Sequence, residues 1–578
     1  MYSNKENVNI LTALLVAHGI HHAVVCPGSR NAPIVHNLNE CPAITCHPVT
    51  DERSAGFYAL GMAQKLAEPV AVCVTSGTAL LNLSPAVAEA YYQRQRIVVI
   101  SADRPLQWIG QLDGQTLPQA GAFVPFVGAS VSVSLPEPHN DEERWYCNRL
   151  VNEALLATWQ RKTAQINVPI SEPLFHFETK ELPEERRISY DAPQNSFADI
   201  VKNGLAEDFS QASKPMIVIG QYEKTDDEFV RIINQLKEHA VVLYEPLGHP
   251  EGGLPFDEVL QRIGNDDRYR PDFLLYCGNT IVSKRLKQFL RKGVECVWEV
   301  TEDGKIHDTF SCVGSVIDSS THVVLGLLSK KFYPLSTLPG EANSSLFTLH
   351  SSLSPHHSSL SPLSSQKNTS EFTGLWHAAL AQQEEIRRTF IPPFSQMAAV
   401  KYFEEHFNSG IVHYANSTAI RLANIYARHY VYCNRGVNGI EGSLSTAAGC
   451  SLVTEEKVFC IIGDLSFFYD QNALWNLHLR GNLRILLLNN GKGGIFNMLK
   501  GLEASPARDP LVAAEHNTTA EGICQQNKVV YLKAVDMQQM SDGIQQLISI
   551  ESTRPVLLEV FTDAETDSTV FWHYYEQQ

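Results

Sequence analysis

The chain has 578 residues, of which 44% are hydrophobic and 19% charged, which is ordinary for a globular protein. Its 46 Lys and Arg are outnumbered by 63 Asp and Glu, and the net charge of −17 argues against nucleic acid or an anionic membrane as a partner. No run of about 20 apolar residues is present, so the sequence predicts no membrane-spanning helix.

The first 20 residues have the pattern of an amphipathic core helix rather than of a signal peptide. Leu11, Leu14 and Leu15 fall on one helical face, and the apolar stretch is too short for secretion. The twelve cysteines include no CxxC pair, and several lie inside expected strands, where they act as small buried hydrophobes. A reducing compartment fits this usage, and we expect the protein in the cytoplasm.

Short apolar runs that end in Gly, Pro, Ser or Asp recur along the chain, and each is followed by a helix-like stretch. Such alternation predicts an α/β fold with parallel sheets and helices on both faces. In these folds ligands bind beyond the carboxyl ends of the strands. The expected strands lie in the segments "HAVVCPGSR", "VAVCVTSGTA", "RIVVISADRP", "PMIVIGQ", "AVVLYEP", "DFLLYCGN", "KVFCIIGD" and "LRILLLNNG".

One segment interrupts this pattern. Residues 336–370 are dominated by Ser and Pro and contain "SSLSP" twice, which predicts a linker or surface excursion. The expected domains are therefore residues 1–185, residues 186–335 and residues 371–578, each of them α/β. The middle block has strands that end in Gly but no G-x-G-x-x-G fingerprint, so we interpret it as mainly structural.

The strongest local signal is a pair of polar residues just past two strand ends. Asp464 follows "VFCIIG" and Asn490 follows "LRILLLN", 26 positions later, a spacing that fits one strand–helix–strand unit. Such a unit brings both side chains to one sheet edge, where carboxylate and amide oxygens suit Mg²⁺. Glycines at 491, 493 and 494 let the backbone approach phosphate closely. The plainer alternative is a strand-end Asp and an unrelated Asn-Gly turn.

This arrangement resembles the cofactor–metal motif of thiamine-diphosphate enzymes, Gly-Asp-Gly followed about two dozen residues later by Asn-Asn. Leu465 stands here in place of the second Gly, a departure from the mainstream decarboxylases. The resemblance implies Mg²⁺ or Mn²⁺ held by Asp464, Asn490 and the backbone carbonyl of Lys492. It also implies three α/β domains of that enzyme type: a pyrimidine-binding domain, a central domain and a diphosphate-binding domain. Further cofactor contacts are expected from Thr78, Leu465 and Ser466.

The segment "VTDERSAGFYALGMAQKLA" predicts a helix that begins near Glu52, with Asp51 or Thr50 as its cap. On its own, Glu52 could simply complement the helix dipole. In the resembled enzymes a Glu at this place meets the aminopyrimidine ring and promotes formation of the cofactor ylid. The resemblance therefore makes Glu52 the catalytic residue, a proton-sharing carboxyl whose pKa is raised by desolvation.

Further motifs occur in order along almost the whole chain outside the Ser-rich segment. They are "CPGSRNAP", "TSGTALLNLSPAVAEA", "SADRP", "DGQTLPQ", "VSKRL", "ANSTAIR" and "NRGVNGIEGSLSTAAG". Together they resemble the SEPHCHC synthase family of menaquinone biosynthesis. That family decarboxylates 2-oxoglutarate on thiamine diphosphate and adds the succinyl carbanion equivalent to isochorismate. It also implies a homodimer or tetramer whose active site lies at the subunit interface.

Both substrates are dianions, so their site needs bidentate cationic donors. The resemblance assigns the carboxylate from 2-oxoglutarate to Ser417 and Arg421, with Arg435 nearby, and places Ile440 beneath the cofactor. Each Arg taken alone could be a surface ion pair, and "SKRLKQFLRK" also fits a solvated helix face. The residues assigned to isochorismate are Ser29, Arg30, Arg104, Gln115, Lys284 and Arg285.

Two alternatives remain open from the sequence. An acetolactate-synthase-like or pyruvate-decarboxylase-like enzyme would share the cofactor motif but would not need so many arginines. A Rossmann-type oxidoreductase or nucleotide-binding regulatory protein is disfavoured, because both its fingerprint and a P-loop are absent.

Overall fold

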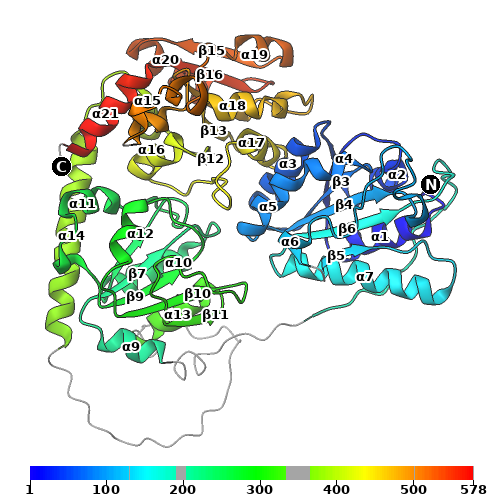
Figure 1. Cartoon of the computed structure of the whole chain (residues 1–578), viewed down its shortest axis with the longest axis horizontal. Helices are drawn as coiled ribbons and strands as arrows, with labels where there is room; N and C mark the ends of the chain where they lie inside the picture. Colours follow the sequence, from blue (N-terminus) through cyan, green and yellow to red (C-terminus); the bar gives the residue numbers. More distant parts are fainter. Residues whose placement is uncertain (129–130, 191–203, 333–364, 500, 577–578) are drawn as a thin grey trace, which may run out of the picture. The chain divides into compact units, whose positions relative to one another are not determined.

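The structure is a computed structural model that describes residues 1–128, 131–190, 204–332, 365–499 and 501–576. It contains three sheets, and every strand pair in them is parallel, which confirms the expected α/β class (Figure 1). The chain forms two compact units. The first comprises residues 1–191, 391–426 and 431–574, and the second comprises residues 192–390, 427–430 and 575–578.

The first sheet has the strand order β2-β1-β3-β4-β6-β5. Its central strands are fully buried and rich in Val, Ile and Ala, as expected for a parallel sheet covered on both faces. Helix α7 packs against α1 and β6, whereas α3 packs against α5 and β3 (Figure 1). The strands are β1 (His22–Val25), β2 (Thr45–Pro48), β3 (Val70–Val74), β4 (Ile97–Asp103), β5 (Ser132–Ser134) and β6 (Ala164–Pro169). The helices are α1 (Glu6–Ala17), α2 (Ala32–Glu40), α3 (Glu52–Leu66), α4 (Thr78–Asn82), α5 (Ser84–Tyr92), η1 (Leu106–Trp108), α6 (Val124–Val127) and α7 (Asp141–Trp159).

The second compact unit holds the sheet β11-β10-β9-β7-β8. Glycines at its strand ends pack against one another: a Cβ on Gly220 would lie 2.1 Å from the Asn279 carbonyl oxygen, and one on Gly248 would lie 2.3 Å from that of Gly220. The backbones of these strand-end loops therefore lie in direct contact. The strands are β7 (Pro215–Ile219), β8 (Val241–Tyr244), β9 (Phe273–Cys277), β10 (Cys296–Thr301) and β11 (Ser315–Asp318). The helices are α9 (Leu205–Gln211), α10 (Asp227–Lys237), α11 (Phe256–Ile263), η3 (Asp267–Tyr269), α12 (Lys284–Leu290), α13 (Thr321–Phe332) and α14 (Ser365–Thr389).

Helix α14 belongs to this second unit. Its buried Trp376 donates a hydrogen bond from Nε1 to the carbonyl of Tyr269 at 3.0 Å. Of the Ser-rich stretch 336–370, residues 336–364 lie outside the described residues, and residues 365–370 form the first turns of α14. The sequence placed the start of the final block at about 371, whereas residues 371–390 pack with the second unit.

The third sheet has the order β12-β13-β14-β16-β15, and β13 and β14 are neighbours. Gly463 at the end of β13 is in register with Leu488 of β14, so both strands end at the same edge. The strands are β12 (Ile411–Tyr414), β13 (Val458–Gly463), β14 (Leu483–Asn489), β15 (Val530–Ala534) and β16 (Val556–Phe561). The helices are α15 (Gln396–His406), α16 (Thr418–Tyr426), α17 (Ser443–Leu452), α18 (Asp464–Tyr469), η5 (Gln471–Leu474), η6 (Gly494–Met498), η7 (Leu502–Ala504), η8 (Arg508–Val512), α19 (Glu521–Asn527), α20 (Met537–Ser549) and α21 (Ala564–Glu576).

Within the first unit, helix α3 of the first sheet packs closely against helix α17 of the third. A Cβ on Gly61 would lie 1.9 Å from the Thr446 carbonyl oxygen, and one on Gly449 would lie 2.1 Å from that of Tyr58. Two glycines therefore allow the two helix backbones to touch. This contact fixes the helix that begins at Glu52 against the third sheet.

None of the helices in the described ranges combines the length and apolar character needed to cross a bilayer.

Candidate active site

Asp464 and Asn490 meet at one edge of the third sheet, as their spacing predicts. The buried Asp464 carboxylate accepts hydrogen bonds from the main-chain N–H groups of Leu465 at 2.7 Å, Asn490 at 3.0 Å and Gly491 at 2.8 Å. Asp464 thus holds the turn after β14 through its backbone. Buried Ser466 lies on the same short helix, α18.

The segment that contains Ala513 and His516 holds the turn that carries Asn490 and Lys492 through hydrogen bonds. The Gly491 carbonyl accepts the N–H of His516 at 2.7 Å, and the Gly493 N–H donates to the carbonyl of Ala513 at the same distance. The Lys492 ammonium group pairs with Asp509 at 3.1 Å. The Nε2 atom of His516 lies 3.6 Å from the Asp464 carboxylate, and this nearby carboxylate raises the pKa of His516.

The residues at this edge fit a small divalent cation that is shared with a phosphate ligand. The Asn490 amide nitrogen donates to Asp567 at 2.9 Å, so the amide oxygen is the atom left to face a cation. Among the described residues, no three His, Cys, Asp or Glu side chains cluster as metal ligands. The three expected ligands are the Asp464 carboxylate, the Asn490 amide oxygen and the Lys492 carbonyl. They leave three positions of an octahedron for other oxygens, as Mg²⁺ bound to a diphosphate requires.

Glu52 is the first residue of α3. The sequence predicts Asp51 or Thr50 as the cap of this helix, and Asp51 is the cap. The Asp51 carboxylate accepts from the N–H of Arg53 at 2.9 Å and from the Nδ2 of Asn472 at 2.8 Å. Arg53 stacks over the Tyr469 ring, 4.6 Å from its centroid. The start of α3 is therefore tied to the end of α18 and to the turn that follows it. Glu52 itself is half-buried, and Asn82 donates to its carboxylate at 3.4 Å.

The residues assigned to isochorismate in the first sheet follow strands β1 and β4, which flank β3, at the same edge. Arg30 is buried and is held by the Ile170 carbonyl at 2.9 Å and by Glu172 at 2.9 Å. Arg104 pairs with Asp113 at 2.8 Å. Both arginines thus pair with carboxylates of the chain itself. Ser29, Thr78 and Gln115 are exposed at this edge.

Gln115 lies close to Thr78 through a tight backbone approach. It has a positive φ of 57°, and a Cβ on Gly77 would lie 3.2 Å from its Cα. The Gly77 N–H is in turn held by Gln119 at 2.7 Å. The turn that carries Gln115 therefore packs on the loop between β3 and α4.

The residues assigned to the 2-oxoglutarate carboxylate lie after β12. Ser417 has a positive φ of 74°, a strained backbone for Ser, and immediately precedes α16, which carries Arg421. Arg435 donates to the Asn416 amide oxygen at 3.1 Å. Asn416 also donates to the carbonyls of Asn434 at 2.6 Å and Gly439 at 2.7 Å, and so it fixes both ends of the loop that leads to Ile440.

Buried Glu89 of α5 holds the same loop from the other side. Its two carboxylate oxygens accept the main-chain N–H groups of Gly436 at 2.6 Å and Val437 at 2.7 Å. Burial raises the pKa of Glu89, and these hydrogen bonds oppose that rise. Sequence reasoning missed Glu89, although a single charge in the apolar helix "SPAVAEAYY" was a signal for a buried partner.

Lys284 and Arg285 lie at the start of α12 in the second unit. Ser283 caps this helix, and Arg285 is engaged within its own unit: it pairs with Asp257, donates to Gln261 at 2.8 Å and lies 4.6 Å over the Tyr575 ring. These contacts give Arg285 a structural role there. Its assignment to isochorismate stays a prediction.

The comparisons with known proteins agree with this geometry. The profile "Thiamine pyrophosphate enzyme, N-terminal TPP binding domain" matches residues 6–122, and "Thiamine pyrophosphate enzyme, C-terminal TPP binding domain" matches residues 415–560. A solved structure entitled "The Crystal Structure of Benzoylformate Decarboxylase from Polynucleobacter necessarius" superposes with a TM-score of 0.66. It is 15% identical and covers 97% of this chain and 99% of its own, a likeness of fold. The chain is thus a thiamine pyrophosphate enzyme, which confirms the expected cofactor.

Curated relatives define the family more narrowly. A 2-succinyl-5-enolpyruvyl-6-hydroxy-3-cyclohexene-1-carboxylate synthase of Bacteroides thetaiotaomicron is 41% identical over 100% of this chain and 99% of its own length. The protein of the same name from Porphyromonas gingivalis is 32% identical over 99% and 97%. The chain belongs to the 2-succinyl-5-enolpyruvyl-6-hydroxy-3-cyclohexene-1-carboxylate (SEPHCHC) synthase family, as its ordered motifs predict.

Proposed function

We propose that this enzyme decarboxylates 2-oxoglutarate and joins the remaining four-carbon unit to isochorismate, with release of CO₂. The observation that carries the proposal is the full-length likeness to named SEPHCHC synthases, together with the arginines that follow β1 and β4. Bound thiamine pyrophosphate supplies the carbanion-stabilising chemistry. The chain's own residues bind two dianions, orient them and exclude water.

The main predicted residues have these places in the proposal. Glu52 shares a proton with the aminopyrimidine of the cofactor, and Asp464 and Asn490 hold a Mg²⁺ or Mn²⁺ ion against its diphosphate. Ser417 and Arg421 take the carboxylate of 2-oxoglutarate, with Arg435 beside them. The carboxylates of isochorismate replace those of Glu172 and Asp113 on Arg30 and Arg104, because a substrate dianion offers both arginines a matching bidentate partner.

We also propose that a second copy of the chain completes the site. Three exposed apolar side chains lie at the end of α18 or shortly after it: Tyr469, Trp475 and Leu477 are 51%, 61% and 83% exposed, and Tyr469 stacks with Arg53 at the start of α3. Glu52, next to Arg53, is only half-buried, whereas its proposed proton-sharing role needs an apolar enclosure. A two-fold interface over this surface would supply that enclosure. Light scattering tests it: wild type should be a dimer or larger, and an active monomer would refute the interface.

The reaction is tested by substrate choice. Purified protein with thiamine pyrophosphate and Mg²⁺ is given isochorismate and either 2-oxoglutarate or pyruvate, and CO₂ and adducts are measured. The proposal expects an adduct with 2-oxoglutarate only and none from Glu52→Gln. An adduct from pyruvate of equal yield would favour an acetolactate-synthase-like enzyme instead. The twelve cysteines form no disulfide in the described residues and most of them are buried, which supports a reducing location, and we propose the cytoplasm.

A further inference from the structure

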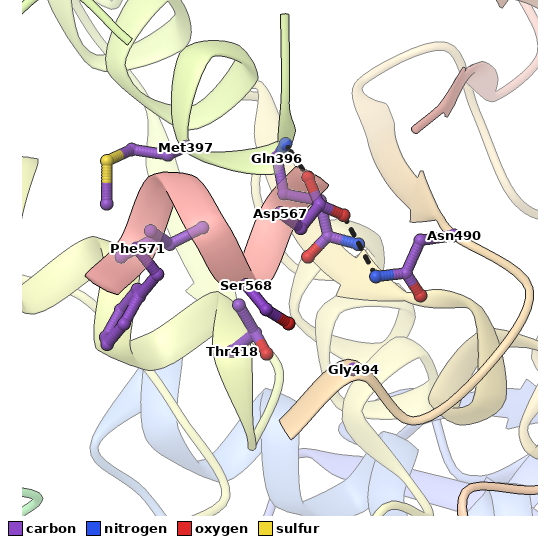
Figure 2. Close-up of a pocket in the computed structure, with 9 residues that line it drawn as sticks. Gln396, Met397, Thr418, Asn490, Gly494, Asp567, Ser568 and Phe571 are labelled. Atoms are coloured by element: carbon purple, nitrogen blue, oxygen red, sulfur yellow. Dashed lines mark hydrogen bonds between the residues drawn. The ribbon is translucent and has the colours of Figure 1, made fainter. Parts of the chain in front are cut away.

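A partly buried carboxylate on α21 contacts the side chain of Asn490 from the side away from the proposed cation. Asp567 Oδ2 accepts the Asn490 Nδ2 hydrogen bond at 2.9 Å and the Thr562 hydroxyl at 2.7 Å. Its Oδ1 accepts the main-chain N–H of Gln396, the first residue of α15, at 2.8 Å. Figure 2 shows the hydrogen bonds of Asp567 with Asn490 and Gln396 beside a small cavity that is also lined by Thr418 and Gly494.

We propose that Asp567 is a positioning residue that sets which end of the Asn490 amide faces the metal. The two ends of an amide have nearly the same shape but opposite character: the oxygen binds a cation and the NH₂ group repels it. A main-chain N–H can only donate, so Gln396 holds Asp567 in the role of acceptor. The Oδ2 of Asp567 therefore takes the Asn490 nitrogen and turns the amide oxygen outward.

This inference rests on the proposed metal role of Asn490 but adds a residue to it. Asp567 lies beyond residue 560, where the match to the C-terminal cofactor-binding profile ends. Partners that orient metal ligands in this way typically change metal affinity by about 10–100-fold when they are replaced. The positioning role concerns the orientation of the Asn490 amide, whereas the bond from the Gln396 N–H holds the start of α15.

The sharpest test replaces Asp567 by its own amide. In Asp567→Asn the oxygen stays with the Gln396 N–H, so the new NH₂ group faces Asn490. Asn490 must then reverse to accept, and it presents its own NH₂ group to the cation. Adding Asn490→Asp restores an oxygen toward the metal, because a carboxylate can accept from the new amide at position 567 and still bind. Thr562→Val is the matched control, since it removes another donor to Asp567 and leaves the Asn490 bond intact.

The readout is the dissociation constant of Mn²⁺ in the presence of saturating thiamine pyrophosphate, followed by electron paramagnetic resonance. Asp567→Asn should weaken Mn²⁺ binding about 10–100-fold, Thr562→Val should stay within about threefold, and the double variant should recover most of the loss. If Asp567→Asn does not fold, Asp567→Ser replaces it in the test. A serine at this position is too short to reach Asn490, so it should weaken Mn²⁺ binding to the same extent. The inference is overturned if the folded Asp567 variant binds Mn²⁺ as tightly as wild type, or if the double variant binds Mn²⁺ no more tightly than Asp567→Asn. Either result leaves the proposed metal site itself intact. A wild-type protein that binds cofactor but no Mn²⁺ overturns the metal assignment as well.

Discussion

The carboxylate of Glu89 accepts the main-chain N–H of Gly436 at 2.6 Å, across 347 residues of the chain. The approach is close enough that a Cβ on Gly436 would lie 2.8 Å from the Glu89 carbonyl oxygen and 2.9 Å from the Tyr92 Cβ. Helix α5 of the first sheet thus sets the path of the loop that carries Arg435 and Ile440. A residue of one domain positions the proposed substrate contacts of another.

Glu89→Gln tests this relationship. A glutamine has a single acceptor oxygen, so one of the buried N–H groups of Gly436 and Val437 loses its partner, at a cost of about 1–3 kcal/mol. We expect a lower melting temperature and a raised KM for 2-oxoglutarate, because Arg435 is less well placed. Thermal unfolding and steady-state kinetics check this. Glu551→Gln, at a 90% exposed glutamate, is the control and should change neither. An unchanged KM in Glu89→Gln would remove the positioning role.

The contact between α3 and α17 predicts that Gly61→Ala is severely destabilising. The added methyl would lie 1.9 Å from the Thr446 carbonyl oxygen, and backbone cannot move aside as a flexible side chain can. Separating the helices also displaces Glu52 from the third sheet, so cofactor binding should fall together with the melting temperature.

Gly374→Ala provides the control for that substitution. Gly374 also lies within a helix, α14, but its Cβ would meet no atom within 4 Å. Alanine is the better helix former by about 0.8–1 kcal/mol, so this change should be neutral or stabilising. Equal melting temperatures for Gly61→Ala and wild type would show that the two helices can separate without cost.

Much of this arrangement is readable in the sequence. Apolar runs followed by helix-like stretches predict three parallel α/β sheets, because buried parallel strands need continuous apolar residues. The spacing from Asp464 to Asn490 predicts their meeting, since adjacent parallel strands end at one edge. Ordered motifs predict the family, which the relatives confirm.

The unpredicted part depends on contacts between residues far apart in the chain. Asp567 reaches Asn490 over 77 residues and Glu89 reaches Gly436 over 347, and neither pair leaves a periodic or spacing pattern. Glu172, which holds Arg30, was missed for the same reason, whereas Asp113 lies only nine positions after Arg104, in the "DGQTLPQ" motif, and was missed although it is close in the chain. Composition also could not show that α14 packs with the second unit, because that depends on where Trp376 is buried. The domain boundaries and the individual ligand contacts stay predictions.

Asp470 should make stability depend on pH. It is fully buried and accepts both the N–H and the hydroxyl of Ser445 at 2.7 Å. Burial raises its pKa to about 6 from an ordinary value of 3.8. Between these values the folded state binds a proton that the unfolded state has released, so stability falls as pH rises from about 4 to 6 and is level above.

The comparison with Asp470→Asn isolates that effect, because asparagine mimics the protonated acid and does not titrate. The stability of wild type relative to Asp470→Asn should fall by roughly 2–3 kcal/mol from pH 4 to pH 7, at about 1.4 kcal/mol for each unit of pKa shift. Melting temperatures of both proteins across this range provide the measurement. A difference that grows in favour of wild type with rising pH would mean that hydrogen bonds outweigh burial at Asp470.

The two proposed carboxylate sites should be separable by mutation. Truncating one partner of a desolvated charge pair costs about 2–5 kcal/mol. Arg421→Ala should therefore slow CO₂ release from 2-oxoglutarate even without isochorismate. Arg104→Ala should leave that release nearly intact and raise the KM for isochorismate. Arg388→Ala, at an exposed arginine of α14, is the control and should affect neither. Equal damage to CO₂ release by Arg104→Ala and Arg421→Ala would refute the assignment.

The joining of 2-oxoglutarate to isochorismate is tested most directly by following carbon. Purified enzyme with thiamine pyrophosphate, Mg²⁺ and isochorismate is given 2-oxoglutarate labelled with ¹³C either at its 1-carboxylate or at all carbons, and product and gas are analysed by mass spectrometry. The account predicts that the 1-carboxylate label leaves entirely as CO₂ and that the fully labelled substrate adds a four-carbon labelled unit to isochorismate. Release of labelled CO₂ with isochorismate recovered unchanged, or a product that retains the 1-carboxylate label, would contradict it.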